Sequence, residues 1–293
     1  DEAVLYEALG LLEPGTDLRA AFTDLLSGGV AGFYDPETDE LVVRGGEITP
    51  MVRQVIVHEL VHALDDQHFE LHRPEYAERA DETSFGFSSV LEGNARRIEG
   101  AWHDQLPEAE RRAVEREELE AMSRQQERIE RVPPVLIEEL SAPYSYGEIF
   151  VREVLDAQGQ AGLDALIVEP PTSSEQILHP SRFLATGERP LEVAPPTSEE
   201  GAEVINEGVL GEFRTSLVLV QETSQRRARE AASGWGGDRY VSWRRPDGTA
   251  CAAVVWKMDS AADLNELRDV LALFVVPRPG AGLSGPSADS VQL

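Results

Sequence analysis

Two histidines and a glutamate stand together in residues 55–69, VIVHELVHALDDQHF. His58 and His62 are four residues apart, so on a helix their imidazoles lie on one face, about 6 Å apart. Imidazoles at that spacing can share one tetrahedral Zn²⁺ ion. Glu59 lies one step round the helix, where it can reach a zinc-bound water and take its proton. The H-E-x-x-H spacing therefore predicts a zinc site with its own general base.

A catalytic zinc ion needs a third protein ligand and one open position. Glu92, in SSVLEGNARRIEG, follows His62 by 30 residues and falls on the next expected helix. An antiparallel return of that helix would bring Glu92 alongside the two histidines, so we expect Glu92 as the third ligand. Glu82 and Glu99 compete with it for this role.

His68 lies six residues after His62, where the metzincin class of zinc peptidases has a third histidine ligand. That motif also needs glycine at position 65, and this chain has Asp65. Without the glycine the helix should continue, which turns His68 far from the face of His62. We therefore do not expect His68 to bind the metal.

Carboxylates on the same helix are candidates to support the ligands. Asp66 lies four residues after His62, so its carboxylate could accept a hydrogen bond from the second ring nitrogen of His62. Asp65 is the neighbouring alternative. Either contact would fix the tautomer and the orientation of the ring.

The motif lies in an expected helix that follows an expected hairpin. Residues 51–69 have helical length and periodicity, and Thr49 with Pro50 is a typical helix start. Because the run is apolar on most faces, we expect a buried central helix. Before it, VAGFY at 30–34 and ELVV at 40–43 predict two strands joined by the turn DPETDE.

The rest of the chain predicts more helices and a change of texture near residue 200. The charged stretch 107–132, with pairs such as Glu120 and Arg124, predicts a solvated helix that acts as a structural spacer. Other helices are expected at 2–12, 16–27, 82–103, 145–158 and 260–274, and strands at 214–221, 239–244 and 250–257. These elements predict an α+β protein with a catalytic domain at 1–198, a small α+β module at 199–276 and a flexible tail at 277–293.

Composition excludes several classes of protein. The 293 residues are 41% hydrophobic and carry a formal net charge of −28, from 54 acids and 26 bases. So acidic a surface repels phosphate backbones, and we expect no nucleic-acid partner. Cys251 is the only cysteine, which excludes a thiolate metal cluster and an intrachain disulfide. The sequence contains no run of 18 apolar residues, so we expect no segment that spans a membrane.

The start of the chain bears on its localisation. The chain starts at Asp1 rather than Met, and we expect a secreted or cell-envelope protein whose upstream signal segment is missing here.

Several strings resemble a known class of enzyme. HELVH with a glutamate on a downstream helix resembles the gluzincin zinc metallopeptidases, the thermolysin-like and aminopeptidase N-like enzymes. The strings HELVHALDDQHF, LEGNA, PYSYGEIFV, PPTSSEQILHP and GWGGDRY together resemble a group of uncharacterised bacterial and archaeal HExxH proteins, over nearly the whole chain. The resemblance implies a zincin-like, mainly helical α+β fold with a small antiparallel sheet, and one Zn²⁺ per chain held by His58, His62 and Glu92. It also implies hydrolysis of a peptide or protein substrate with Glu59 as general base.

The resemblance extends to candidates for stabilising the oxyanion. Aminopeptidase N-like enzymes have a tyrosine three residues before a glycine, beyond the third ligand, and its hydroxyl donates to the oxyanion. PYSYG places Tyr144 three residues before Gly147 in the same chain order, with Tyr146 as a competitor. His179, in SSEQILHP, is a second candidate donor or a substrate contact.

The resemblance is incomplete at one supporting position, and it adds an expectation for the hairpin. Thermolysin-like enzymes have an aspartate four residues after the glutamate ligand, and this chain has Arg96 there. Zincin sheets hold extended peptide along an edge strand, for which residues 29–34 or 41–44 are the candidates against a plain structural hairpin.

Together these features predict a zinc-dependent peptidase. No string like G-x-M-E-N precedes HELVH to bind a substrate amine, which favours an endopeptidase. The alternatives are an inactive zinc-binding module for interaction or envelope assembly, and a structural protein without metal.

Overall fold

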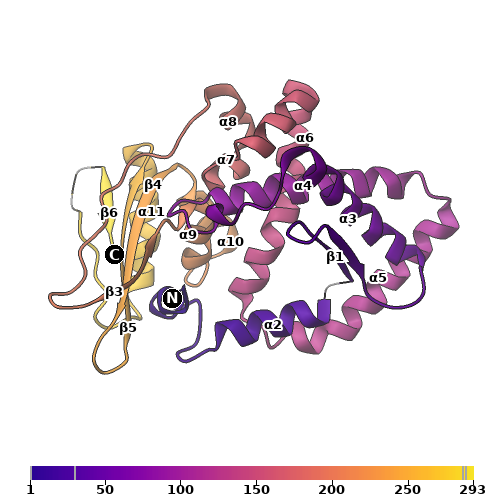
Figure 1. Cartoon of the computed structure of the whole chain (residues 1–293). Helices are drawn as coiled ribbons and strands as arrows, with labels where there is room; N and C mark the ends of the chain where they lie inside the picture. The colour runs from indigo at the N-terminus through magenta and orange to yellow at the C-terminus, as the bar shows by residue number, and fades with distance from the viewer. Residues whose placement is uncertain (1, 30, 286, 288) are drawn as a thin grey trace. The chain divides into compact units, whose positions relative to one another are not determined.

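A computed structural model of the chain describes residues 2–29, 31–285, 287 and 289–293. The chain is α+β and mainly helical, with two small antiparallel sheets, which confirms the coarse fold class (Figure 1). It divides into two compact units. The helical unit comprises residues 18–78 and 85–170, and the sheet unit comprises residues 1–17, 79–84 and 171–293.

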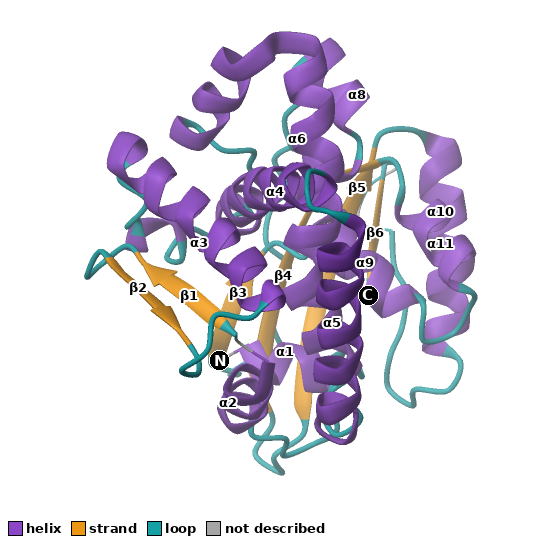
Figure 2. Cartoon of the chain, turned by 90° about the vertical axis from the view of Figure 1, so that its right-hand side faces the viewer, coloured by secondary structure: helices purple, strands orange, loops and turns teal. Residues whose placement is uncertain are grey.

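The helical unit contains one hairpin and five long helices, of which α4 begins in the sheet unit. They are α2 (Leu18–Gly29), β1 (Gly32–Asp35), β2 (Glu40–Val43), α3 (Pro50–Phe69), α4 (Thr83–Asp104), α5 (Glu108–Ile129) and α6 (Pro134–Val168), with a short 3-10 helix η1 (Pro74–Tyr76). The hairpin lies beside α3 (Figure 2), and both of its strands contact that helix.

Helix α3 begins and ends at strong local signals. The Thr49 side chain accepts the N–H of Val52 at 3.3 Å, and Pro50 occupies the first turn, as the sequence predicts. The helix ends at Phe69, and Glu70 follows in the left-handed region with φ of 54°. The helix therefore continues through position 65 without a break.

The predicted burial of α3 is wrong in one respect. Its buried residues are mostly polar, while Leu60 and Leu64 are 53% and 56% exposed. The polar face is turned inward because its side chains find hydrogen-bond partners on neighbouring elements, and a satisfied polar group can be buried at little cost.

Helices α4 and α6 cross with their backbones in contact. A Cβ atom on Gly93 would lie 2.2 Å from the carbonyl oxygen of Gly147, and one on Gly147 would lie 2.1 Å from the carbonyl oxygen of Ser89. Two glycines at the crossing allow this approach. Helix α6 starts at Pro134, well before the predicted residue 145, and bends at Gly159, where φ is 67°.

Helix α5 does more than the spacer that the sequence predicts. Its outer face carries the expected Glu120–Arg124 pair at 3.8 Å. Its inner face contacts α3: Glu117 accepts the N–H of Met51 at 3.2 Å, and Glu118 accepts from Gln54 at 2.7 Å. Helix α5 is therefore part of the support for α3.

The sheet unit contains an antiparallel sheet with strand order β3-β4-β5-β6. Its elements are α1 (Glu2–Ala8), α7 (Ser174–Leu178), α8 (Pro180–Thr186), β3 (Val204–Gly208), α9 (Gly211–Leu219), α10 (Gln225–Ala232), β4 (Trp235–Arg244), β5 (Ala250–Met258), α11 (Ala261–Val275) and β6 (Ser290–Gln292). The predicted strands at 239–244 and 250–257 and the helix at 260–274 are confirmed.

The predicted strand at 214–221 is wrong, because these residues belong to α9 and the turn after it. The carboxylate of Asp238, on β4, accepts the N–H groups of Leu210 and Gly211 at 2.8 Å each. A carboxylate on the first N–H groups stabilises a helix start. The hydrophobic residues of EFRTSLVL fit the spacing of a helix or of a strand, and the carboxylate of Asp238 favours the helix.

The predicted domain boundaries also differ from the two units. The sheet unit begins at residue 171 rather than 199, and it includes residues 1–17, because the buried Leu5 and Tyr6 lie on α1, which contacts β4 and β5. The tail expected at 277–293 is not wholly flexible, because β6 pairs with β5 and buries Val291. Among the described helices, none has the length and apolar character needed to cross a membrane.

Candidate metal centre

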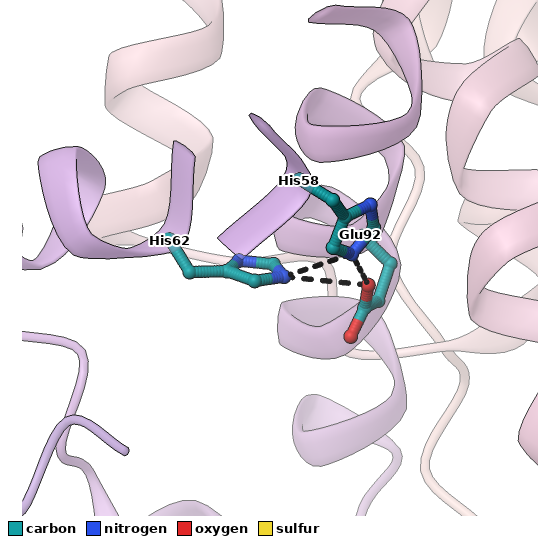
Figure 3. Close-up of side chains that lie close together, drawn as sticks. All are labelled: His58, His62 and Glu92. Carbon is teal, nitrogen blue, oxygen red and sulfur yellow. Dashed lines mark hydrogen bonds and ion pairs between the residues drawn. The ribbon is translucent and has the colours of Figure 1, made fainter. Parts of the chain in front are cut away.

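Three predicted ligands converge in the helical unit. His58 and His62 project from α3, and Glu92 projects from α4 toward them (Figure 3). Nε2 of His58 lies 3.2 Å from Nε2 of His62 and 3.1 Å from Oε2 of Glu92, and the third separation, His62 to Glu92, is 3.5 Å. Among the described residues, this is the one group of His, Cys, Asp or Glu side chains spaced to share a metal ion.

The three separations fit tetrahedral coordination. Ligand atoms at about 2.0–2.1 Å from one ion, placed at tetrahedral angles, lie about 3.3 Å from each other. The observed 3.1, 3.2 and 3.5 Å scatter around that value. Two imidazoles and a carboxylate leave the fourth position for water or substrate, which is the composition of catalytic zinc sites.

Glu99 contacts the second ring nitrogen of His58, Nδ1. Its Oε2 lies 3.0 Å from Nδ1 of His58, and its Oε1 accepts from Arg96 at 2.6 Å and from Gln54 at 2.8 Å. A carboxylate on the second ring nitrogen fixes the orientation of a ligating histidine. The sequence indicated Glu99 only as a competing ligand. The missed signal is its spacing, seven residues and two turns after Glu92 on one face of α4.

Charge attraction draws these side chains together. Burial alone would lower the pKa of His58, but the carboxylates of Glu92 and Glu99 outweigh burial and raise the pKa to about 9. Burial alone would raise the pKa of Glu92, but hydrogen bonds from His58 and His62 lower it to about 2. The cluster therefore attracts positive charge at its centre.

Glu59 lies beside the ligands and is held by the hairpin. Its Oε2 accepts the backbone N–H of Tyr34, on β1, at 2.9 Å. Burial raises the pKa of Glu59, although the two histidines and the Tyr34 N–H act in the opposite direction. The carboxylate is therefore both oriented and close to the metal-binding face, as a general base requires.

Tyr144 reaches the same centre from α6. Its ring stacks on that of His58, with centroids 6.0 Å apart and an interplanar angle of 22°. Loss of solvation and the nearby Glu92 carboxylate raise the pKa of the Tyr144 hydroxyl. Tyr144 lines the cleft at the metal centre, whereas Tyr146 is not among its lining residues.

The predicted support of His62 by Asp66 is wrong. Asp66 accepts the Tyr34 hydroxyl at 2.7 Å and the N–H of Leu71 at 2.6 Å, so both of its oxygens serve the hairpin and the end of α3. Asp65, the alternative, accepts from the Asn94 amide at 2.8 Å. Both aspartates tie α3 to its neighbours instead of holding a ligand.

The other candidates lie elsewhere. His68 is on the exposed side of α3 with its Nδ1 3.0 Å from the carbonyl oxygen of Leu64, which agrees with its exclusion as a ligand. Glu82 belongs to the sheet unit, where it accepts from Ser174. His179 also belongs to the sheet unit, with its Nε2 2.9 Å from both carboxylate oxygens of Glu212. The structure does not bring His179 into the group of ligands, and its role at an oxyanion stays a prediction.

A cleft of about 580 Å³ opens at the candidate metal centre. It is lined by Ala31, Gly32, Met51, Gln54, Val55, His58, Glu59, Arg96, Glu99, Glu118, Tyr144, Ser145 and Glu148. Ala31 accepts from the N–H of Arg44, so in the alternating antiparallel pattern the backbone groups of Gly32 and Tyr34 face away from β2. Of the two candidate edges, β1 is therefore the one at the cleft.

The comparisons with known proteins concern the sheet unit. The model of a family described as a domain of unknown function (DUF8575) matches residues 201–277, which extend from β3 through α11. No curated protein and no solved structure matches the chain at a significant level. The matched region includes none of the residues of the candidate metal centre.

Proposed function

We propose that this chain is a zinc-dependent peptidase whose helical unit is a zincin-like core of the gluzincin type. The observation that supports this most directly is the spacing of three ligand atoms, 3.1 to 3.5 Å apart, on two histidines of an H-E-x-x-H helix and a glutamate of the next long helix. His58, His62 and Glu92 would hold one Zn²⁺ per chain.

Zinc bound there would supply a Lewis acid that lowers the pKa of water and polarises a carbonyl. Glu59, oriented by the Tyr34 N–H, takes the proton of the attacking water and later gives it to the leaving amine. Tyr144, stacked on His58, donates its hydroxyl hydrogen to the developing oxyanion. Glu99 keeps the His58 ring in position throughout.

The substrate in this proposal is an extended peptide. Gly32, on β1, presents backbone groups that face away from β2 at the wall of the cleft. Peptides bind such edges as an added strand, and this pairing would place the scissile bond in the cleft close to Glu59. The lack of an amine-binding string before HELVH favours cleavage within a chain over cleavage at its end.

The test is Glu59→Gln, which removes the proton acceptor and leaves the ligands intact. Denatured casein is the substrate, and cleavage is followed by mass spectrometry. We expect wild type to cleave and the variant to lose at least about a hundredfold in rate, the effect of a general base, while zinc content stays at one ion per chain. Glu127→Gln, an exposed position on α5, is the matched control and should keep full activity. Equal rates of cleavage for wild type and Glu59→Gln would defeat the proposal, and zinc binding without any cleavage by wild type would favour an inactive zinc-binding module.

A further inference from the structure

The cleft extends along α3 beyond the metal centre. Gln54 and Met51, one and two turns before His58, belong to its wall, together with Glu118 of α5. At a rise of 1.5 Å per residue, Gln54 lies about 6 Å along the helix axis from His58. A long side chain of a substrate bound at the metal centre can span that distance.

The charges on this part of the cleft are unbalanced. Arg96 is matched by Glu99, at 2.6 Å, and Glu148 is matched by Arg152, at 2.7 Å. Glu118 accepts one hydrogen bond, from Nε2 of Gln54 at 2.7 Å, and forms no ion pair within the part of the chain that the structure describes. Its negative charge is therefore free to meet a cation.

Gln54 adds a second, independent sign of a ligand. The residue is 8% exposed, and its Nε2 is shared between the carboxylates of Glu99 and Glu118. Oε1 of the same amide has no hydrogen-bond partner among the described residues. Buried acceptors without a donor are rare in folded proteins, because their lost hydration is not replaced. Gln54 therefore lacks a donor, and Glu118 beside it lacks a cation.

We propose that this end of the cleft binds a cationic group of the peptide substrate, an ammonium or a guanidinium. Such a group offers only donors, so it can pair with the carboxylate of Glu118, and Oε1 of Gln54 would reach the same donors once the buried amide turns toward the cleft. The cation can be a lysine or arginine side chain next to the cleaved bond, or the free amine at the start of the peptide. This inference rests on the proposed peptidase function.

The test compares peptides that differ in one charge. The zinc-loaded full chain is given N-acetylated peptides with lysine or with the neutral norleucine next to the cleaved bond, and norleucine peptides with a free amine. We expect kcat/KM to favour a cationic peptide over the neutral one by about ten- to a hundredfold, the range for a hydrogen bond to a charged group. Glu118→Gln should remove most of that preference. Glu127→Gln is the control with the same charge change, nine residues along α5 on its opposite face, and should keep the preference.

Binding gives a readout without turnover. In the Glu59→Gln background, calorimetry should show the cationic peptide binding more tightly than the neutral one, and adding Glu118→Gln should abolish the difference. A preference for lysine in acetylated peptides assigns the site to a side chain, and a preference for the free amine assigns it to the peptide start. Cleavage with neither preference would overturn the inference and leave the peptidase proposal intact. Cation binding that depends on Glu118, without cleavage of any peptide, would overturn the peptidase proposal instead.

Discussion

The crossing of α4 and α6 gives a sharp test of how the metal centre is positioned. Gly93→Ala puts a Cβ atom 2.2 Å from the carbonyl oxygen of Gly147, which is 1.2 Å short of the 3.4 Å at which ordinary contact begins. The obstacle is backbone, so no rotamer change can relieve the overlap and one helix must move. Overpacking of this kind costs about 1–3 kcal/mol, and we expect the upper end because two backbones are in contact.

The same displacement should weaken metal binding. Gly93 adjoins the proposed ligand Glu92, and Gly147 lies three residues after Tyr144, so a shift at the crossing moves both side chains relative to His58. We expect the free energy of unfolding in urea to fall by about 2–3 kcal/mol and zinc affinity to fall by about tenfold, the lower end for disturbed supporting contacts.

Gly100→Ala is the matched control on the same helix. Nothing lies within 4 Å of a Cβ atom at Gly100, so this variant should gain about 0.5–1 kcal/mol from helix propensity. If Gly93→Ala proves as stable as Gly100→Ala, and binds zinc as wild type does, the reasoning about the crossing is refuted.

Two further predictions concern single carboxylates. Glu99→Gln weakens the hydrogen bond that orients His58, so zinc affinity measured by chelator competition should fall by about ten- to a hundredfold. Unchanged affinity would show that Glu99 does not support His58 as a ligand. Burial raises the pKa of Glu82 from its ordinary 4.5 to about 8, against two hydrogen bonds from Ser174. The folded state then binds this proton more tightly than the unfolded chain, so the free energy of unfolding should fall as pH rises from about 4.5 to about 8. Glu82→Gln should gain stability over wild type between pH 5 and pH 8, and parallel pH profiles would contradict this.

The sequence predicts α3 and the placement of its two histidines well because the signals are local. Thr49 and Pro50 start the helix, and the four-residue spacing places His58 and His62 on one face whatever surrounds them. Glu92 could be chosen because it belongs to the next long helix. The spacing of Tyr144 before Gly147 identified a side chain that does lie against His58.

What the sequence could not predict depends on contacts between distant segments. The spacing of Glu92 and Glu99 puts both on one face of α4, but which nitrogen of His58 each carboxylate meets depends on how α4 packs beside α3, and no local pattern records that. The choice of helix over strand for α9 depends on Asp238, 28 residues from Leu210. The prediction that α3 buries its apolar residues is wrong, because hydrophobicity alone does not show which face of a helix will meet polar partners.

A crystal structure of the zinc-loaded chain, with anomalous scattering at the zinc edge, tests most directly whether His58, His62 and Glu92 hold one zinc ion. We expect one ion per chain, about 2.0–2.1 Å from Nε2 of each histidine and about 2.0–2.2 Å from a carboxylate oxygen of Glu92. A zinc ion bound elsewhere, or these three side chains splayed apart with no ion between them, would contradict this prediction.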